Sequence, residues 1–176
     1  QGLVQIQELG TLETPIALTN TLNVGRVHDA LVEYMVGQAE KHGVELRSVN
    51  PVVGECNDAS LNRITERVIG IPEVMSAIES AEADFEEGDV GAGKGTTCFG
   101  LKGGIGSASR IFQVGTECYT LGVLVQSNFG STENLRIDGQ PVGRRFLQGP
   151  AVFLASDASN FVNGHVLYVD GGILAY

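Results

Sequence analysis

The sequence predicts a protein of the α/β class, because segments with helical periodicity alternate along the chain with segments that have strand patterns. Two segments, 24–42 and 72–84, repeat their apolar residues at the spacing of one helix face. Three others, 46–53, 108–114 and 119–126, are short runs rich in apolar residues, which is typical of strands. The chain has 176 residues, 43% of them hydrophobic, which suits one compact main domain.

The N-terminal third is expected to hold a strand, a helix and a second strand. Residues 1–19 read as extended, because LVQIQEL alternates apolar with polar residues and PIALT is a short apolar run. Asn23 is expected to cap the helix over 24–42, and Gly43 to end it. The strand over 46–53 then leads into the segment GECNDASLN, whose side chains favour a turn.

The middle of the chain is expected to hold one more helix and a hairpin. Pro72 suits the first position of the helix over 72–84. The two strands over 108–114 and 119–126 read as a hairpin with a short turn between them. The segment LRIDGQPVG reads as a further strand with a turn at Asp138.

The composition of the chain excludes some classes of binding partner. The formal net charge of −10 argues against a nucleic-acid ligand, because phosphate binding needs a basic surface. No apolar run approaches the roughly 20 residues that cross a bilayer, so no membrane partner is expected. The cysteines Cys56, Cys98 and Cys118 are odd in number and lack CxxC spacing. We therefore expect a reduced, cytoplasmic protein.

The glycine-rich segment 88–106 contains near-matches to two nucleotide-binding motifs. GDVGAGKGT resembles a phosphate loop, in which Gly88, Gly93 and Lys94 fit the pattern G-x-x-x-x-G-K. A phosphate loop must follow a buried strand and open a helix, whereas this segment follows an acidic stretch and precedes more glycines. We therefore expect no nucleotide to bind here.

The same segment ends in GLKGGIG, which fits the G-x-x-x-G-I-G turn of short-chain dehydrogenases. Those enzymes also need a Tyr-x-x-x-Lys pair further along the chain. The residues four positions after Tyr34, Tyr119 and Tyr168 are glutamine, valine and glycine, so no such pair exists. A complete dehydrogenase is therefore excluded.

Several longer blocks between residues 2 and 144 resemble one family, the L-aminopeptidase/D-esterases and β-peptidyl aminopeptidases. The blocks are PIALTNTLNVGRVHDALVEY, SVNPVVGECND, GDVGAGKGTTCFGLKGGIGSASR, YTLGVLVQSNFG and LRIDGQPVG. The resemblance implies a four-layer αββα sandwich of the N-terminal nucleophile hydrolase type, incomplete in this chain. It also implies a precursor that cuts itself, so that the serine opening the smaller subunit becomes the nucleophile. No cofactor is expected.

The resemblance implies roles for two asparagines. Asn128, in VQSNFG, matches the asparagine whose side-chain amide helps to form the oxyanion hole, a duty that suits an N–H donor. Asn57 falls where several relatives carry a tyrosine that lines the substrate pocket, and is expected to bind substrate. The implied partners are a smaller subunit with the serine nucleophile, a peptide, amide or ester substrate, and further copies in a homo-oligomer. No metal is expected.

The chain departs from this family after Arg144, because no serine opening a strand rich in valine and isoleucine follows. Residues 149–172 instead resemble the C-terminal end of short-chain dehydrogenases, with a helix after Pro150 and a strand at HVLYV. We therefore divide the chain into 1–144, an aminopeptidase-like larger-subunit segment, and 145–176, a dehydrogenase-like tail. The segment alone is expected to be inactive. The alternatives are a fragment of an NAD(P)-dependent dehydrogenase and a non-catalytic interaction protein.

Overall fold

A computed structural model describes residues 2–146 of the chain, of which 145 and 146 are described by their backbone alone. The chain divides into two compact units. The first unit comprises the chain up to Thr97 and Gly103–Asn128, and the second comprises Cys98–Lys102 and the chain from Phe129 onward.

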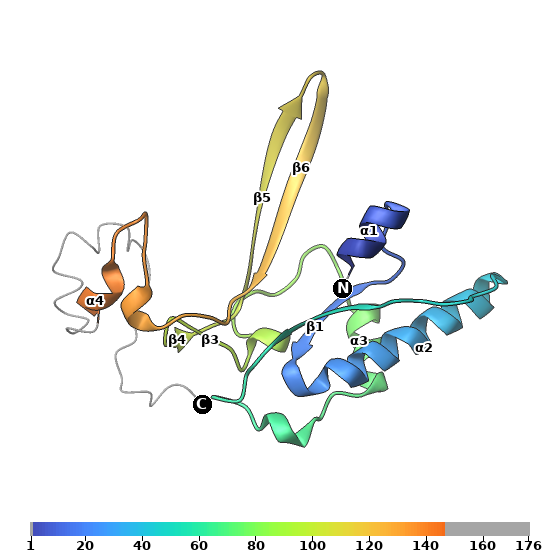
Figure 1. Ribbon diagram of the computed structural model, residues 1–176, viewed down its shortest axis with the longest axis horizontal. Coiled ribbons are helices and arrows are strands. Elements are labelled where there is room, and N and C mark those ends of the chain that lie inside the picture. The colour runs from blue at the N-terminus through green and yellow to red at the C-terminus, as the bar shows by residue number, and fades with distance from the viewer. Residues whose placement is uncertain (1, 147–176) are drawn as a thin grey trace. The chain divides into compact units, whose positions relative to one another are not determined.

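The described chain contains both helices and strands, as Figure 1 shows. The helices are α1 (Leu3–Leu9), α2 (Val24–His42), α3 (Ile71–Glu79) and α4 (Val142–Phe146). The strands are β1 (Ile16–Asn20), β2 (Val52–Cys56), β3 (Thr97–Cys98), β4 (Leu101–Lys102), β5 (Ile105–Val114) and β6 (Glu117–Gln126). Short 3-10 turns are η1 (Thr21–Asn23), η2 (Ile64–Glu66), η3 (Gly91–Gly93) and η4 (Thr132–Asn134). The predicted α/β class is confirmed.

The core of the first unit lies between a parallel strand pair and two helices. β1 and β2 pair in parallel, with Ile16 opposite Val52, and α2 connects them. A parallel pair needs such a crossover, because a tight turn can join only antiparallel strands. α2 contacts both strands and also α3, which lies beside it in Figure 1. The buried core consists of Val27, Ala30 and Leu31 from α2 and Val74 from α3.

The predicted helix over 24–42 is confirmed as α2, but its cap differs from the prediction. The Asn23 side chain makes no capping bond to α2. Instead, the Asn23 backbone N–H donates to Asn20 Oδ1 at 3.2 Å, at the start of the 3-10 turn that leads into α2. Gly43 ends the helix as predicted, at a φ of 64° that favours glycine.

Four element predictions were wrong in kind or in extent. Within 1–19, β1 is a strand, but LVQIQEL forms the helix α1. Leucine, glutamine and glutamate all have high helix propensity, and this local preference overrides the alternation. The strand predicted over 46–53 begins only at Val52, after buried Pro51, and α3 ends at Glu79 instead of 84. The strand predicted at LRIDGQPVG is reduced to a bridge between Ile137 and Gln140 around the expected turn.

The predicted hairpin is confirmed and is longer than expected. β5 and β6 pair antiparallel from Ile105 opposite Gln126 to Val114 opposite Glu117, and Gly115 turns between them at a φ of 63°. Ser127 and Asn128 follow directly after the C-terminal end of β6. Most side chains of both strands are exposed.

The second unit is organised around two phenylalanines. Phe99 and Phe129 pack edge-to-face with ring centroids 4.7 Å apart, and the Phe99 N–H donates to the Phe129 carbonyl at 2.7 Å. Thr132 Oγ1 donates to the Phe99 carbonyl, also at 2.7 Å. The tail predictions, namely the helix after Pro150, the HVLYV strand and most of the segment 145–176, lie outside the described residues.

Among residues 2–146, no helix is both long and apolar enough to cross a membrane. The same part of the chain contains no group of three or more His, Cys, Asp or Glu residues placed to hold a metal ion.

Candidate active site

Asn128 lies where the hairpin returns to the body of the first unit, two residues beyond the end of β6. Its side chain is held at both ends. The backbone N–H of Thr97 donates to Asn128 Oδ1 at 3.2 Å, and Asn128 Nδ2 donates to the carbonyl oxygen of Asn57 at 3.0 Å. The structure thus brings together the two asparagines that the sequence singled out, although 71 residues separate them.

These two bonds fix which way the Asn128 amide faces. A backbone N–H bonds only to the side-chain oxygen, and a backbone carbonyl bonds only to the side-chain nitrogen, so both neighbours select one orientation. The Asn57 carbonyl takes one of the two hydrogens on Nδ2. Because this bond fixes the position of Nδ2, it also fixes the direction of the second Nδ2–H group.

Asn57 contributes its backbone to this arrangement. Its side chain is turned back on the chain, since Asn57 Oδ1 accepts from the N–H of Ala59 at 3.0 Å. This local bond is the turn-forming behaviour expected of asparagine. The residue is exposed, so its remaining amide group lies at the surface of the unit.

The glycine-rich segment packs backbone against backbone beside Asn128. Ser127 Oγ accepts from the N–H of Gly104 at 3.1 Å and donates to its carbonyl at 3.2 Å. A Cβ at Gly103 would lie 2.5 Å from the Ser127 carbonyl oxygen, and one at Gly104 would lie 2.6 Å from the Gly88 carbonyl oxygen. Only glycine permits this approach, which gives the motif GLKGGIG a structural reason.

The phosphate-loop pattern has a different geometry from a phosphate cradle. A phosphate loop presents free backbone N–H groups. Here the N–H groups of Gly93, Lys94 and Thr96 donate to the carbonyls of Val90, Gly91 and Gly93 in the η3 turn. This supports the expectation that no nucleotide binds the segment, which stays a prediction.

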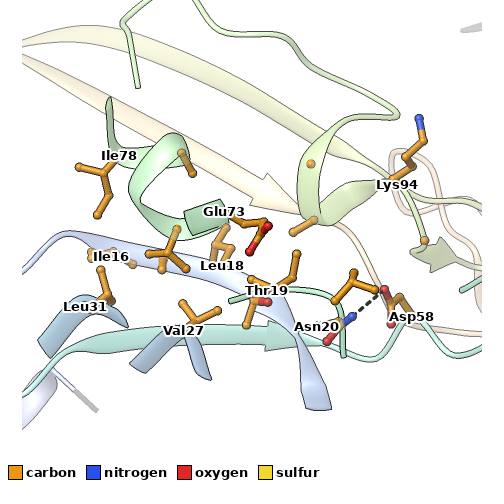
Figure 2. A pocket seen from close by; sticks show the side chains of 18 of the residues that line it. Ile16, Leu18, Thr19, Asn20, Val27, Leu31, Asp58, Glu73, Ile78 and Lys94 are labelled. Atoms are coloured by element: carbon orange, nitrogen blue, oxygen red, sulfur yellow. Dashed lines mark hydrogen bonds between the residues drawn. The ribbon is translucent and has the colours of Figure 1, made fainter. Parts of the chain in front are cut away.

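A buried carboxylate lies next to the two asparagines. Asp58 is 6% exposed, and its Oδ2 accepts from Asn62 Nδ2 at 2.8 Å and from Asn20 Nδ2 at 3.3 Å. Its other oxygen, Oδ1, is buried without a partner among the described residues. Figure 2 shows the bond from Asn20 to Asp58 at one end of a pocket.

That pocket, of about 850 Å³, lies inside the first unit. Its walls are mainly apolar side chains of β1, α2 and α3, including Leu18, Leu31 and Ile78, and the end near Asn20 and Asp58 is polar (Figure 2). The whole of β1 lines it. In the described part of the chain β1 pairs with β2 alone, so its second edge offers unpaired backbone groups.

Cys56 is the side chain in this region whose acidity changes. Burial raises the pKa of the Cys56 thiol, and the negative charge of the neighbouring Glu55 raises it further. A thiol with a raised pKa stays protonated at neutral pH and is a poor nucleophile.

Sequence reasoning missed Thr97 and Asp58. Thr97 acts through its backbone N–H, which leaves no signature in a sequence. Asp58 stood inside a segment interpreted only as a turn. It accepts a hydrogen bond from Asn20, 38 residues earlier in the chain, and a contact over that distance could not be found from local pattern.

Comparison with known proteins identifies the family of the chain. A sequence model described as peptidase family S58 matches residues 1–172. The chain belongs to peptidase family S58. It is 38% identical over 144 residues to the β-peptidyl aminopeptidase BapA of Sphingosinicella xenopeptidilytica, a match that covers 81% of this chain and 36% of BapA.

Solved structures of similar sequence have the same fold. The PH0078 protein of Pyrococcus horikoshii OT3 is 52% identical with a TM-score of 0.77, over 85% of this chain and 42% of that one. The L-aminopeptidase D-Ala-esterase/amidase of Ochrobactrum anthropi is 36% identical with a TM-score of 0.69, over 76% and 38%. That enzyme is a prototype of the serine aminopeptidases and a variant of the N-terminal nucleophile (Ntn) hydrolase fold. The predicted family and fold are confirmed, and the S58 chain spans about two fifths of the length of these relatives.

The dehydrogenase similarity is confined to a short segment. The chain is 76% identical over 29 residues to the 2-dehydro-3-deoxy-D-gluconate 5-dehydrogenase of Formosa agariphila, which is 16% of this chain and 11% of that enzyme. The division of the chain at 144 and 145 stays a prediction.

Proposed function

We propose that this S58 chain is the larger-subunit segment of a self-processing serine aminopeptidase. The complete enzyme would release N-terminal residues from peptides, amides or esters, using the N-terminal serine of a smaller subunit as nucleophile. In this proposal Asn128 supplies the N–H that stabilises the oxyanion formed when the serine attacks the substrate carbonyl. Asn57 borders the same site and is proposed to contact the substrate.

The observation that carries the proposal is the two-ended clamp on the Asn128 amide. An oxyanion donor must be oriented before the reaction, because reorienting it during the reaction would add to the barrier. Thr97 and Asn57 hold the oxygen and one hydrogen of the amide, and they leave the second hydrogen for an external acceptor. A side chain that only capped a strand end would not need both contacts.

The partner proposal rests on surfaces that the described chain leaves uncovered. The second edge of β1 borders an apolar pocket, and an unpaired strand edge is a template for another strand. We propose that a strand of the smaller subunit pairs with β1 there. Pairing would satisfy the backbone groups of β1, and the apolar side chains of the added strand would fill the pocket.

The test joins residues 1–144 of this chain to the remaining part of the Ochrobactrum anthropi enzyme. This chimera is expected to cleave itself and to hydrolyse amino-acid p-nitroanilides, whereas the chain alone is expected to show no activity. In the active chimera Asn128→Ala should lower kcat by about 10²–10³-fold while changing KM little, because the oxyanion contact exists mainly in the transition state.

The matched control is Asn134→Ala. Asn134 is an exposed asparagine whose side chain donates to Ser131 Oγ, so its loss should leave kcat unchanged. If Asn128→Ala raised KM and left kcat intact, Asn128 would bind substrate without serving the oxyanion. A folded, cleaved chimera without activity would contradict the proposed function. The cytoplasmic location and the homo-oligomer stay predictions.

A further inference from the structure

We propose that Asp58 is a positioning residue: its buried carboxylate holds the Asn57 carbonyl, and through it the Asn128 amide, in the orientation described above. The inference rests on the proposed function for its catalytic meaning. The claim that Asp58 sets the direction of the Asn128 amide does not depend on that function and can be tested without it.

The carboxylate of Asp58 joins segments that are distant in sequence. Asn20, at the end of β1, and Asn62, in the turn after β2, both donate to the same oxygen, Asp58 Oδ2. Hydrogen bonds to a charged acceptor are stronger than those between neutral groups, and burial shields them from competing water. Asp58 therefore ties the turn at 57–62 to the end of β1.

The backbone of Asp58 closes the same turn. Its carbonyl oxygen accepts from the N–H groups of Leu61 at 3.1 Å and Asn62 at 2.9 Å. The preceding carbonyl, that of Asn57, is the one that accepts from Asn128 Nδ2. The side chain and the carbonyl of Asp58 are thus both held, which fixes one end of the peptide group that carries the Asn57 carbonyl.

Asp58 also packs against the segment that leads to Thr97, the second support of the Asn128 amide. Gly95 lies so close that a Cβ added to it would be 2.8 Å from Asp58 Cβ. Thr97, two residues further on, donates the N–H that holds Asn128 Oδ1. Both contacts that orient the amide, one from Asn57 and one from Thr97, therefore trace back to segments packed on Asp58.

The pattern of bonds specifies which substitutions are tolerated. Both donors address Oδ2, whereas Oδ1 has no partner among the described residues. An asparagine at 58 can present its oxygen to both donors and place its nitrogen where Oδ1 lies. Asp58→Asn should therefore retain the position, and Asp58→Leu, of similar shape, should lose it.

The experiment measures the side-chain amide signals of Asn128 by ¹⁵N NMR in the full chain, assigned by their loss in Asn128→Ala. In the unsubstituted chain the Nδ2 proton that is bonded to the Asn57 carbonyl should exchange slowly with water. Asp58→Leu should raise its exchange rate by about fivefold or more, the factor expected when one hydrogen bond is released. Asp58→Asn should leave it within about twofold.

A second variant covers the case in which Asp58→Leu does not fold. Asn62→Ala removes the 2.8 Å donor from an exposed position and leaves Asp58 in place, so it should raise the exchange rate in the same direction. Asn134→Ala, at an exposed site in the second unit, is the control and should change nothing. Unchanged Asn128 signals in a folded Asp58→Leu, or in Asn62→Ala where Asp58→Leu does not fold, would overturn the inference.

The chimera described above separates this inference from the proposed function. If the amide signals respond to position 58 but Asn128→Ala leaves kcat unchanged, the positioning holds and the oxyanion role fails. If both hold, Asp58→Leu should lower kcat more than it changes KM, and Asp58→Asn should restore kcat.

Discussion

At the scale of single residues, the glycines of the KGGIG motif differ in how tightly they are packed. A Cβ at Gly104 would lie 2.6 Å from the Gly88 carbonyl oxygen, whereas one at Gly106 would meet nothing within 4 Å. We expect Gly104→Ala to lower the free energy of unfolding by about 1–3 kcal/mol, because backbone atoms must move apart. Gly106→Ala should leave it unchanged or raise it by about 0.5 kcal/mol, because alanine restricts the unfolded chain. Urea unfolding followed by circular dichroism compares the two, and equal losses would contradict the packing argument.

The sequence identified Asn128 and Asn57 only through the blocks in which they stand. Nothing in the pattern around either residue indicates that one donates to the other across 71 positions. Thr97 and Asp58 were not found at all, because one acts through a backbone N–H and the other through burial. Such contacts are set by tertiary packing, which local patterns do not report.

At the scale of elements, α2 contributes most of the buried core of the first unit. Leu31 is completely buried against α3 and the strand pair, whereas Val36, one and a half turns further on, is 41% exposed. We expect Leu31→Ala to lower the free energy of unfolding by about 2–5 kcal/mol, through lost burial and the cavity that remains. Val36→Ala should change it by about 0.5 kcal/mol or less. Thermal or urea unfolding measures both, and comparable effects would mean that this face of α2 is not the core.

Elements were predictable where their signals are local. The ends of α2 follow from asparagines before it and Gly43 after it, and its buried face follows from period 3.6. The start of β2 was not predictable in this way, because residues 46–51 carry apolar side chains but form no ladder. The partner strand β1 sets that boundary by pairing from Ile16 with Val52. For Leu3–Leu9, the alternation of apolar and polar residues indicated a strand, whereas the helix propensity of the residues favoured a helix. The segment forms the helix α1.

At the scale of the whole molecule, one face of the β5–β6 hairpin is apolar and exposed. Side chains alternate between the two faces of a strand pair, so Phe112, Tyr119, Leu121, Val123 and Val125 share a face. Each of them is exposed, and exposed apolar patches of this kind favour association. This exposed apolar face gives the predicted homo-oligomer a physical basis.

We accordingly expect the isolated chain to self-associate as its concentration rises, and Leu121→Glu to reduce this association strongly. Leu121 lies opposite Arg110 on this face, so the new carboxylate gains a cross-strand partner and replaces an apolar side chain with a charged one. Thr120→Glu is the matched control, because it adds the same charge one residue earlier on the opposite face, beside Ile111. Sedimentation velocity over a range of concentrations, with circular dichroism to verify folding, measures the effect. Equal loss of association in both variants would assign it to net charge, and persistence in Leu121→Glu would show that other surfaces associate.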